Sequence, residues 1–197
     1  MSKGRGTCAA TVCISLLFVV AATNGCAFGD RNVALKYTPV TKISARALPD
    51  VAVVKLADVR SREEVGEVRN GYGMKTATVW ARNQDVGAWV ANALCQELTG
   101  VGCRVEKYED APPPGADASV TGEVTEVYAK MFMSSRATVK ADLCVQKAGV
   151  VVLNEEYTGK HSVLALTAST GEYEKVLQGA LQDLMKKAVP EIVAALE

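Results

Sequence analysis

Apolar and polar positions alternate along this chain with two different periods, and each period predicts one kind of element. From residue 118 to residue 163 the period is close to two, and between Val139 and Val145 every second residue is apolar. This pattern is typical of strands with one buried and one polar face. We therefore predict a meander of long antiparallel strands here, with a tight turn at residues 147–149.

Two other stretches have the period of a helix. The first extends from Asp85 to Gly100, which are favourable residues for the start and the end of a helix. The second opens with Ser169–Glu172, the sequence of a capping box, and its apolar stripe continues to Leu196. Pro190 is expected to kink or end this second helix.

Shorter apolar runs precede these elements. We predict strands at residues 32–40, 50–59 and 101–109 and a further short strand at 76–80, with a charged, glycine-rich loop at 61–75. A mostly antiparallel sheet with a long β-meander and two amphipathic helices packed on one face is a two-layer α+β fold.

The first residues differ in character from the rest. Lys3 and Arg5 precede an apolar run at residues 8–22, and small residues follow it. This is the layout of a secretory signal, and the run is too short for a comfortable membrane span of about 20 residues. We therefore predict a cleaved signal peptide at residues 1–25.

Cys26 follows Gly25 directly, as the acylated cysteine does in the lipobox of bacterial lipoproteins. Cleavage by signal peptidase I is the alternative, because Gly25 and Ala27 are the small residues which that enzyme requires. Lipidation of Cys26 predicts a short tether at residues 26–31 and a single periplasmic domain at 32–197. By similarity to enterobacterial lipoproteins, Ala27 directs the protein to the outer membrane.

Charge and cysteine content narrow the function further. The whole chain has a formal net charge of zero, and the predicted signal removes Lys3 and Arg5, so nucleic acid is not an expected partner. Cys95, Cys103 and Cys144 remain after Cys26. Cys95 and Cys103 either form a disulfide across a short loop or stay as two separate half-buried thiols. No CxxC motif occurs, so we expect no metal.

No catalytic constellation is present in the sequence. His161 is the sole histidine, no GxSxG motif accompanies it, and a structural role or exposure is its default interpretation. Glu155 and Glu156 are neighbours on a strand and point to opposite faces. Gly66 and Gly71 have the spacing of a phosphate-binding loop, but no lysine follows them. We predict a protein that is not an enzyme and has no cofactor.

The charged loop and the edges of the meander are the predicted contact surfaces. Within the loop we select Arg60, Arg62, Asn70 and Tyr72 as a possible partner-binding group. The first hypothesis is a module that binds an envelope protein or another envelope component near the membrane, or a second copy of itself. The alternative is an auxiliary lipoprotein of an envelope transport or assembly system that carries lipid or glycan between sheet and helix.

Several of these features together resemble the YajG-like family of bacterial lipoproteins. The resemblance rests on the lipobox-like cysteine, on the strand that ends in Asp58 and Arg60, on the glycines of the loop, on the helix after Asp85 and on the long meander. It implies an outer-membrane lipoprotein that faces the periplasm, and Cys26 is the one position to which it assigns a role.

Overall fold

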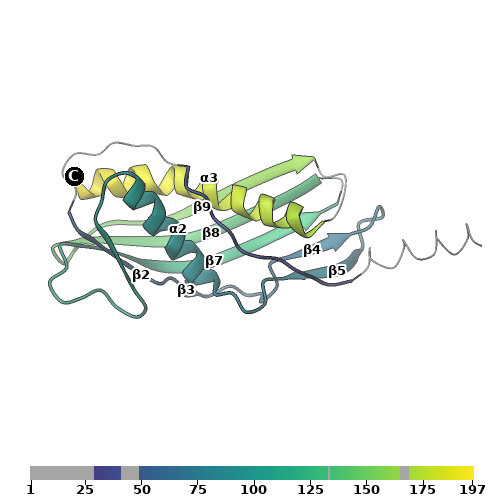
Figure 1. Ribbon diagram of the computed structural model, residues 1–197, viewed down its shortest axis with the longest axis horizontal. Helices are drawn as coiled ribbons and strands as arrows, with labels where there is room; N and C mark the ends of the chain where they lie inside the picture. The colour runs from purple at the N-terminus through teal and green to yellow at the C-terminus, as the bar shows by residue number, and fades with distance from the viewer. Residues whose placement is uncertain (1–28, 41–48, 133, 165–168) are drawn as a thin grey trace, which may run out of the picture.

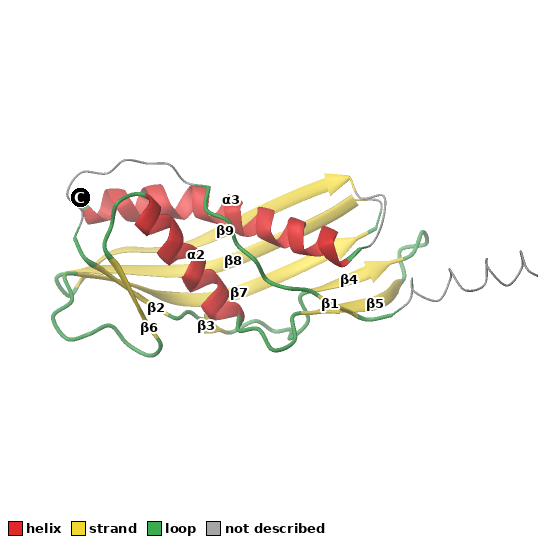
Figure 2. Ribbon diagram, viewed as in Figure 1, coloured by secondary structure: helices red, strands yellow, loops and turns green. Residues whose placement is uncertain are grey.

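The computed structural model describes residues 29–40, 49–132, 134–164 and 169–197. The predicted signal peptide and Cys26 lie outside these residues. In the described part of the chain, nine strands form one open sheet and two helices, α2 and α3, cover one of its faces (Figures 1 and 2). The predicted α+β fold class, with a long meander and two helices, is confirmed.

The long strand β7 (Ala118–Met131) is the centre of the sheet. On one side it pairs antiparallel with β8 (Ser134–Lys147), which pairs antiparallel with β9 (Val150–Leu164). This is the predicted meander, and the turn between β8 and β9 has positive φ at Ala148 and Gly149. The alternation of β8 buries its apolar residues under the helices and leaves its polar residues on the uncovered face.

Short strands line the other side of β7, one after another and all parallel to it, so the sheet is mixed. They are β2 (Val51–Val54), β3 (Ala57–Asp58) and β4 (Gly66–Arg69). β6 (Val105–Tyr108) extends the sheet from β2, β5 (Lys75–Trp80) extends it from β4, and β1 (Arg31–Asn32) pairs with β5.

The prediction for residues 61–75 is wrong in detail. The predicted loop at 61–75 contains β4 and the first residue of β5, which form a hairpin whose turn includes Gly73 at a φ of 78°. This strand was not predicted because two of its four residues, Glu67 and Arg69, are charged and make the stretch resemble a polar loop. Both project from the same face of β4. Gly66 allows β4 to approach β7, because a Cβ there would lie 2.4 Å from the carbonyl oxygen of Ala129.

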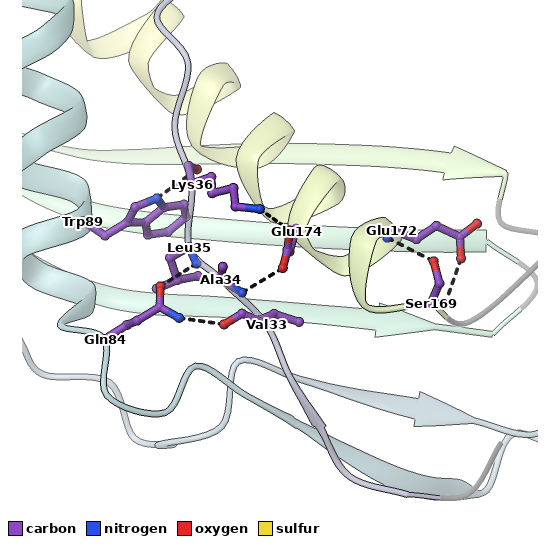
Figure 3. Close-up of polar contacts among 9 residues, drawn as sticks. All are labelled: Val33, Ala34, Leu35, Lys36, Gln84, Trp89, Ser169, Glu172 and Glu174. Atoms are coloured by element: carbon purple, nitrogen blue, oxygen red, sulfur yellow. Dashed lines mark hydrogen bonds and ion pairs between the residues drawn. The ribbon is translucent and has the colours of Figure 1, made fainter. Parts of the chain in front are cut away.

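The helices begin where the sequence predicts. In α2 (Val86–Gly100) the Asp85 side chain caps the helix by accepting from the backbone N–H of Ala88 at 2.9 Å. α3 (Thr170–Leu196) begins with the predicted capping box, drawn in Figure 3, and continues through Pro190. Among the described residues, none of the helices combines the length and the apolar character needed to span a membrane.

Residues 33–40, named the strap from here on, do not form the predicted strand. The strap crosses the outer side of the molecule between α2 and α3 (Figure 3). The amide of Val33 still donates to the carbonyl of Trp80 in β5 at 2.8 Å, and beyond it side chains bind the backbone of the strap. The amide of Ala34 donates to Glu174 at 3.0 Å and that of Leu35 to Gln84 at 2.6 Å. Trp89 donates its indole N–H to the carbonyl of Lys36 at 3.1 Å.

Candidate functional site

The four residues predicted as one partner-binding loop lie in two places, because β4 separates them. Arg60 and Arg62 follow β3 and lie beside β7. Asn70 and Tyr72 lie in the hairpin turn, where the Asn70 side chain accepts from the amides of Tyr72 and Met74 at 3.0 and 3.1 Å. Asn70 therefore shapes the turn, while the Tyr72 side chain is 90% exposed.

Arg60 and Arg62 line a pocket of about 340 Å³ on the uncovered face of the sheet. Its wall is one stretch of β7, formed by Thr125, Glu126, Val127, Tyr128 and Lys130. The carboxylate of Glu126 is paired with Lys140 of β8 at 3.4 Å. The guanidinium carbon of Arg62 is 4.9 Å from the centre of the Tyr128 ring, and the ammonium nitrogen of Lys130 is 5.7 Å from it. Both distances place a cation in contact with an aromatic ring.

A β-bulge forms the inner end of this pocket. The register between β7 and β8 shifts between Val124 and Glu126, so Thr125 has no partner residue in β8. Such bulges redirect side chains at functional sites. The hydroxyl oxygen of Thr125 is buried and has no hydrogen-bond partner among the described residues.

Arg60 is held rigidly in the pocket by Asp58. Its Nε and Nη2 donate to the two oxygens of Asp58 at 2.7 and 2.8 Å, and this guanidinium holds the pKa of the Asp58 carboxyl below its usual value. The Arg60 side chain is only 8% exposed. Its remaining guanidinium nitrogen, Nη1, is buried with no partner in the described residues. Buried polar atoms are rarely left in this state.

Glu67 lies next to Tyr128 and directly opposite Lys130, so it offsets part of the positive charge around the pocket. It accepts from the Tyr128 hydroxyl and, at 2.7 Å, from Arg69. Burial alone would raise the pKa of Glu67, but the two hydrogen bonds and the nearby charges of Arg69 and Lys130 together outweigh burial and lower it. Within the described residues, neither Arg62 nor Lys130 takes part in a salt bridge.

Charges on the uncovered face are sorted along the strands. At one end Lys130 lies directly opposite Arg136, and Arg69 opposite Lys75. Like charges in such cross-strand positions repel one another. Farther along the strands the charge reverses, in a row that consists of Glu123, Asp142 and Glu156.

The basic end of the sheet, which we call the hairpin end, also exposes large apolar side chains. β4 is parallel to β7 with Val68 opposite Met131, so the β4–β5 turn and the β7–β8 connection lie at the same end. The end of β9 is there too, because Leu164 pairs with Ser134. The exposed residues are Tyr72 at 90%, Met74 at 60%, Phe132 at 47% and Leu164 at 90%.

The described chain enters the fold from this end. β1 is parallel to β5, and β5 starts at the hairpin turn, so Gly29 and Asp30 lie on the side of β1 that faces the hairpin end. Asp30 is already fixed, since its carboxylate accepts from the amide of Thr78 at 2.8 Å and from the indole of Trp80 at 3.3 Å. The predicted tether at 26–31 therefore includes two residues, Asp30 and Arg31, that belong to the folded domain.

The other residues singled out in the sequence have structural surroundings. Cys95 is half-buried and Cys103 buried, both are unpaired in this structure, and burial raises the pKa of both thiols. His161 packs against α3, where a Cβ on Gly179 would lie 2.4 Å from its ring. Among the described residues, no three His, Cys, Asp or Glu side chains are grouped so as to hold a metal ion.

The groove proposed beneath α3 is filled at its centre. A Cβ on Gly159 of β9 would lie 2.0 Å from the carbonyl oxygen of Ala180, so the helix backbone rests directly on the strand. A separate pocket of about 530 Å³ lies at the opposite end of the sheet, between β2, β6 and the loop that contains Pro113.

Sequence reasoning missed Thr125, Tyr128 and Lys130 as members of the site. The alternation of β7 does place Tyr128 and Lys130 together on the polar face, which was an available signal. The bulge at Thr125 has no comparable signal in the sequence.

Comparisons with known proteins support the fold. No protein-family model and no curated protein matches the chain. A solved structure from Xanthomonas campestris, described as family-model DUF330, is similar over 85% of this chain and 95% of its own, with 12% identity and a TM-score of 0.56. A hypothetical protein from Chlamydia trachomatis is similar over 76% and 98%, with 10% identity and a TM-score of 0.51.

A lipoprotein from Neisseria meningitidis matches over 74% of this chain and 99% of its own, with 15% identity and a TM-score of 0.39. The first two likenesses establish that the fold is shared with other bacterial proteins. The YajG-like resemblance stays a prediction.

Proposed function

We propose that the protein is a non-catalytic lipoprotein, anchored through an acylated Cys26, whose domain stands with its hairpin end toward the membrane and binds an envelope component there. The outer membrane, with the domain facing the periplasm, is its proposed location. The anchor is supported by the signal layout and by Gly25 before Cys26.

One observation carries this proposal: the chain enters the fold at the end that exposes Tyr72, Met74, Phe132 and Leu164. The segment from Cys26 to the first fixed residue, Asp30, reaches at most roughly 14 Å when fully extended. An acylated Cys26 would therefore hold the hairpin end at the bilayer surface. Tyr72 and Phe132 would then lie at the depth where aromatic side chains are favoured, and Lys75, Lys130 and Arg136 would lie near the headgroups.

The anchor is tested by the intact mass and the N-terminal peptide of the protein purified from membranes. We expect a chain that starts at Cys26 and carries acyl groups, and we expect the precursor to accumulate when lipoprotein signal peptidase is inhibited. A chain that starts after residue 26 without lipid would contradict the anchor.

The orientation is tested by hydrogen exchange on the purified protein, compared between detergent and phospholipid vesicles. Amides of the β4–β5 turn, at residues 70–74, are expected to exchange more slowly in vesicles. The β8–β9 turn at 148–149 lies at the opposite end and serves as the internal control. Equal protection of both turns would contradict the proposed orientation.

A further inference from the structure

We propose that the pocket beside Tyr128 binds the phosphate group of a phosphate ester, either a lipid headgroup or a small soluble molecule. The inference rests on the proposed function and adds to it the chemistry of the envelope component that is bound.

The inner end of the pocket lacks acceptors. Nη1 of Arg60 is a buried donor without a partner, on a side chain that Asp58 already fixes in place. The hydroxyl of Thr125, which the bulge leaves without a cross-strand neighbour, is buried and unpaired as well. An oxygen-rich ligand that reaches this end would pair with both, and because Arg60 is preorganised it would lose little side-chain freedom on binding.

The outer end of the pocket supplies positive charge. Arg62 is stacked on the Tyr128 ring, an arrangement that leaves the N–H groups at the edge of its guanidinium free to donate. Lys130 lies opposite Arg136 of β8 and opposite Glu67 of β4, and an anion beside Lys130 and Arg136 would add an attraction to both cations.

The number of donors favours phosphate over carboxylate. Arg60, Arg62, Lys130 and the two hydroxyls of Ser61 and Thr125 exceed what the two oxygens of a carboxylate would satisfy. Phosphate presents three or four oxygens, and arginine suits its geometry. A volume of about 340 Å³ is at the small end for ligand pockets, so a group of the size of glycerol phosphate fits.

The test is calorimetric titration of the full protein, purified from membranes in a non-ionic detergent, with glycerol 3-phosphate and with glycerol as the uncharged control. We expect the ester to bind and glycerol not to bind. Arg62→Ala and Lys130→Ala should each weaken binding roughly tenfold through loss of a charge-assisted contact. Lys186→Ala removes the same charge from the exposed side of α3, in the other layer, and should leave the affinity unchanged.

Thr125→Val separates a ligand contact from a structural role. Because the hydroxyl has no partner in the protein, this variant should bind the ester more weakly while its melting temperature stays the same or rises. A fall in melting temperature with unchanged affinity would show that the hydroxyl serves the fold, and would overturn its place in the site.

Two short-chain lipids identify the source of the phosphate. Tighter binding of dihexanoyl phosphatidylglycerol than of glycerol 3-phosphate, with dihexanoylglycerol inert, supports a lipid headgroup. Binding of the soluble ester alone supports a soluble ligand. The proposal is overturned if neither ester binds, or if the Arg62 and Lys130 variants bind as the unaltered protein does. If the purified chain carries no acyl groups but still binds the phosphate ester, the proposed anchor is contradicted and the proposed phosphate site is supported.

Discussion

At the scale of single residues, the buried side chain of Glu97 connects α2 to the strap through hydrogen bonds. Its side chain is inaccessible to solvent, and it accepts from the Tyr37 hydroxyl and, at 2.7 Å, from the amide of Val40. Burial and the hydrogen bond between Tyr37 and Glu97 together raise the pKa of the Tyr37 hydroxyl far above its usual value, so the phenol remains a donor at any physiological pH. A carboxylate is tolerated in such a place only while its hydrogen bonds are kept.

The loss of stability on replacing Glu97 should therefore depend on whether the new side chain can accept a hydrogen bond. Glu97→Ala leaves two donors of the strap without their acceptor and should lower the free energy of unfolding by about 2–4 kcal/mol. Glu97→Gln keeps an acceptor oxygen and should lower it by less than half as much. Denaturant unfolding of both variants measures the difference, and equal losses would contradict the role assigned to the oxygen.

The burial of Glu97 could have been predicted from the helical periodicity of α2. Residues 90, 93, 94 and 98 define the apolar stripe of α2, and position 97 lies inside that stripe. A carboxylate there indicates a buried acceptor. Its partners, Tyr37 and Val40, could not be predicted, because a strap bound by side chains has no periodicity of its own.

The contact between α3 and β9 determines, at the scale of elements, how the two layers fit. Gly159 lets the helix backbone rest on the strand, as described above, and a side chain there would have to displace the helix. Gly171, in the first turn of α3, has no neighbour within 4 Å of the position of a Cβ. The same substitution therefore has opposite consequences at these two glycines.

Gly159→Ala should lower the free energy of unfolding by about 1–3 kcal/mol through overpacking. Gly171→Ala should raise it by up to about 1 kcal/mol, because alanine loses less conformational freedom in a helix. Thermal unfolding of both variants, followed by circular dichroism, provides the comparison. A stable Gly159→Ala protein would contradict the close approach of α3 to β9.

Element length explains which parts of the fold the sequence predicts. The meander and the two helices extend over many periods of their patterns, and each was predicted with nearly correct limits. β3 and β4 have two and four residues, too few to show a period, and both exist because β7 offers them hydrogen-bonding partners. The pocket beside Tyr128 depends on the bulge and on β3, so it could not be assembled from the sequence.

At the scale of the whole molecule, the chain enters the fold at the hairpin end. The pocket beside Tyr128 lies toward the same end of the sheet. Two carboxylates hold that entering segment. The amide of Thr78 and the indole of Trp80 lower the pKa of Asp30, and the amide of Ala34 and the ammonium of Lys36 lower that of Glu174. Each carboxylate therefore stabilises the folded chain at neutral pH.

These contributions should disappear in acid. Because both pKa values are lower in the folded protein, the stabilisation is complete above the usual values of 3.8 and 4.5 and is lost as the pH falls through the lower, folded values. The protection factors of the Ala34 and Thr78 amides, corrected for the intrinsic pH dependence of exchange, should fall over that range before those of the β8 amides do. The Asp30→Asn and Glu174→Gln double variant, which has nothing to titrate at these positions, should lack this early phase.

The contacts of the strap with α3 can form only late in the synthesis of the chain. Ala34 is bound by Glu174, which follows it by 140 positions, so a ribosome adding about 5–20 residues per second needs roughly 7–28 s to produce the partner. Throughout that interval the strap has none of its α3 contacts. Under the proposed anchor, an enzyme that cuts before Cys26 during synthesis would act before α3 binds the strap, and the strap can dock only after the last helix has been made.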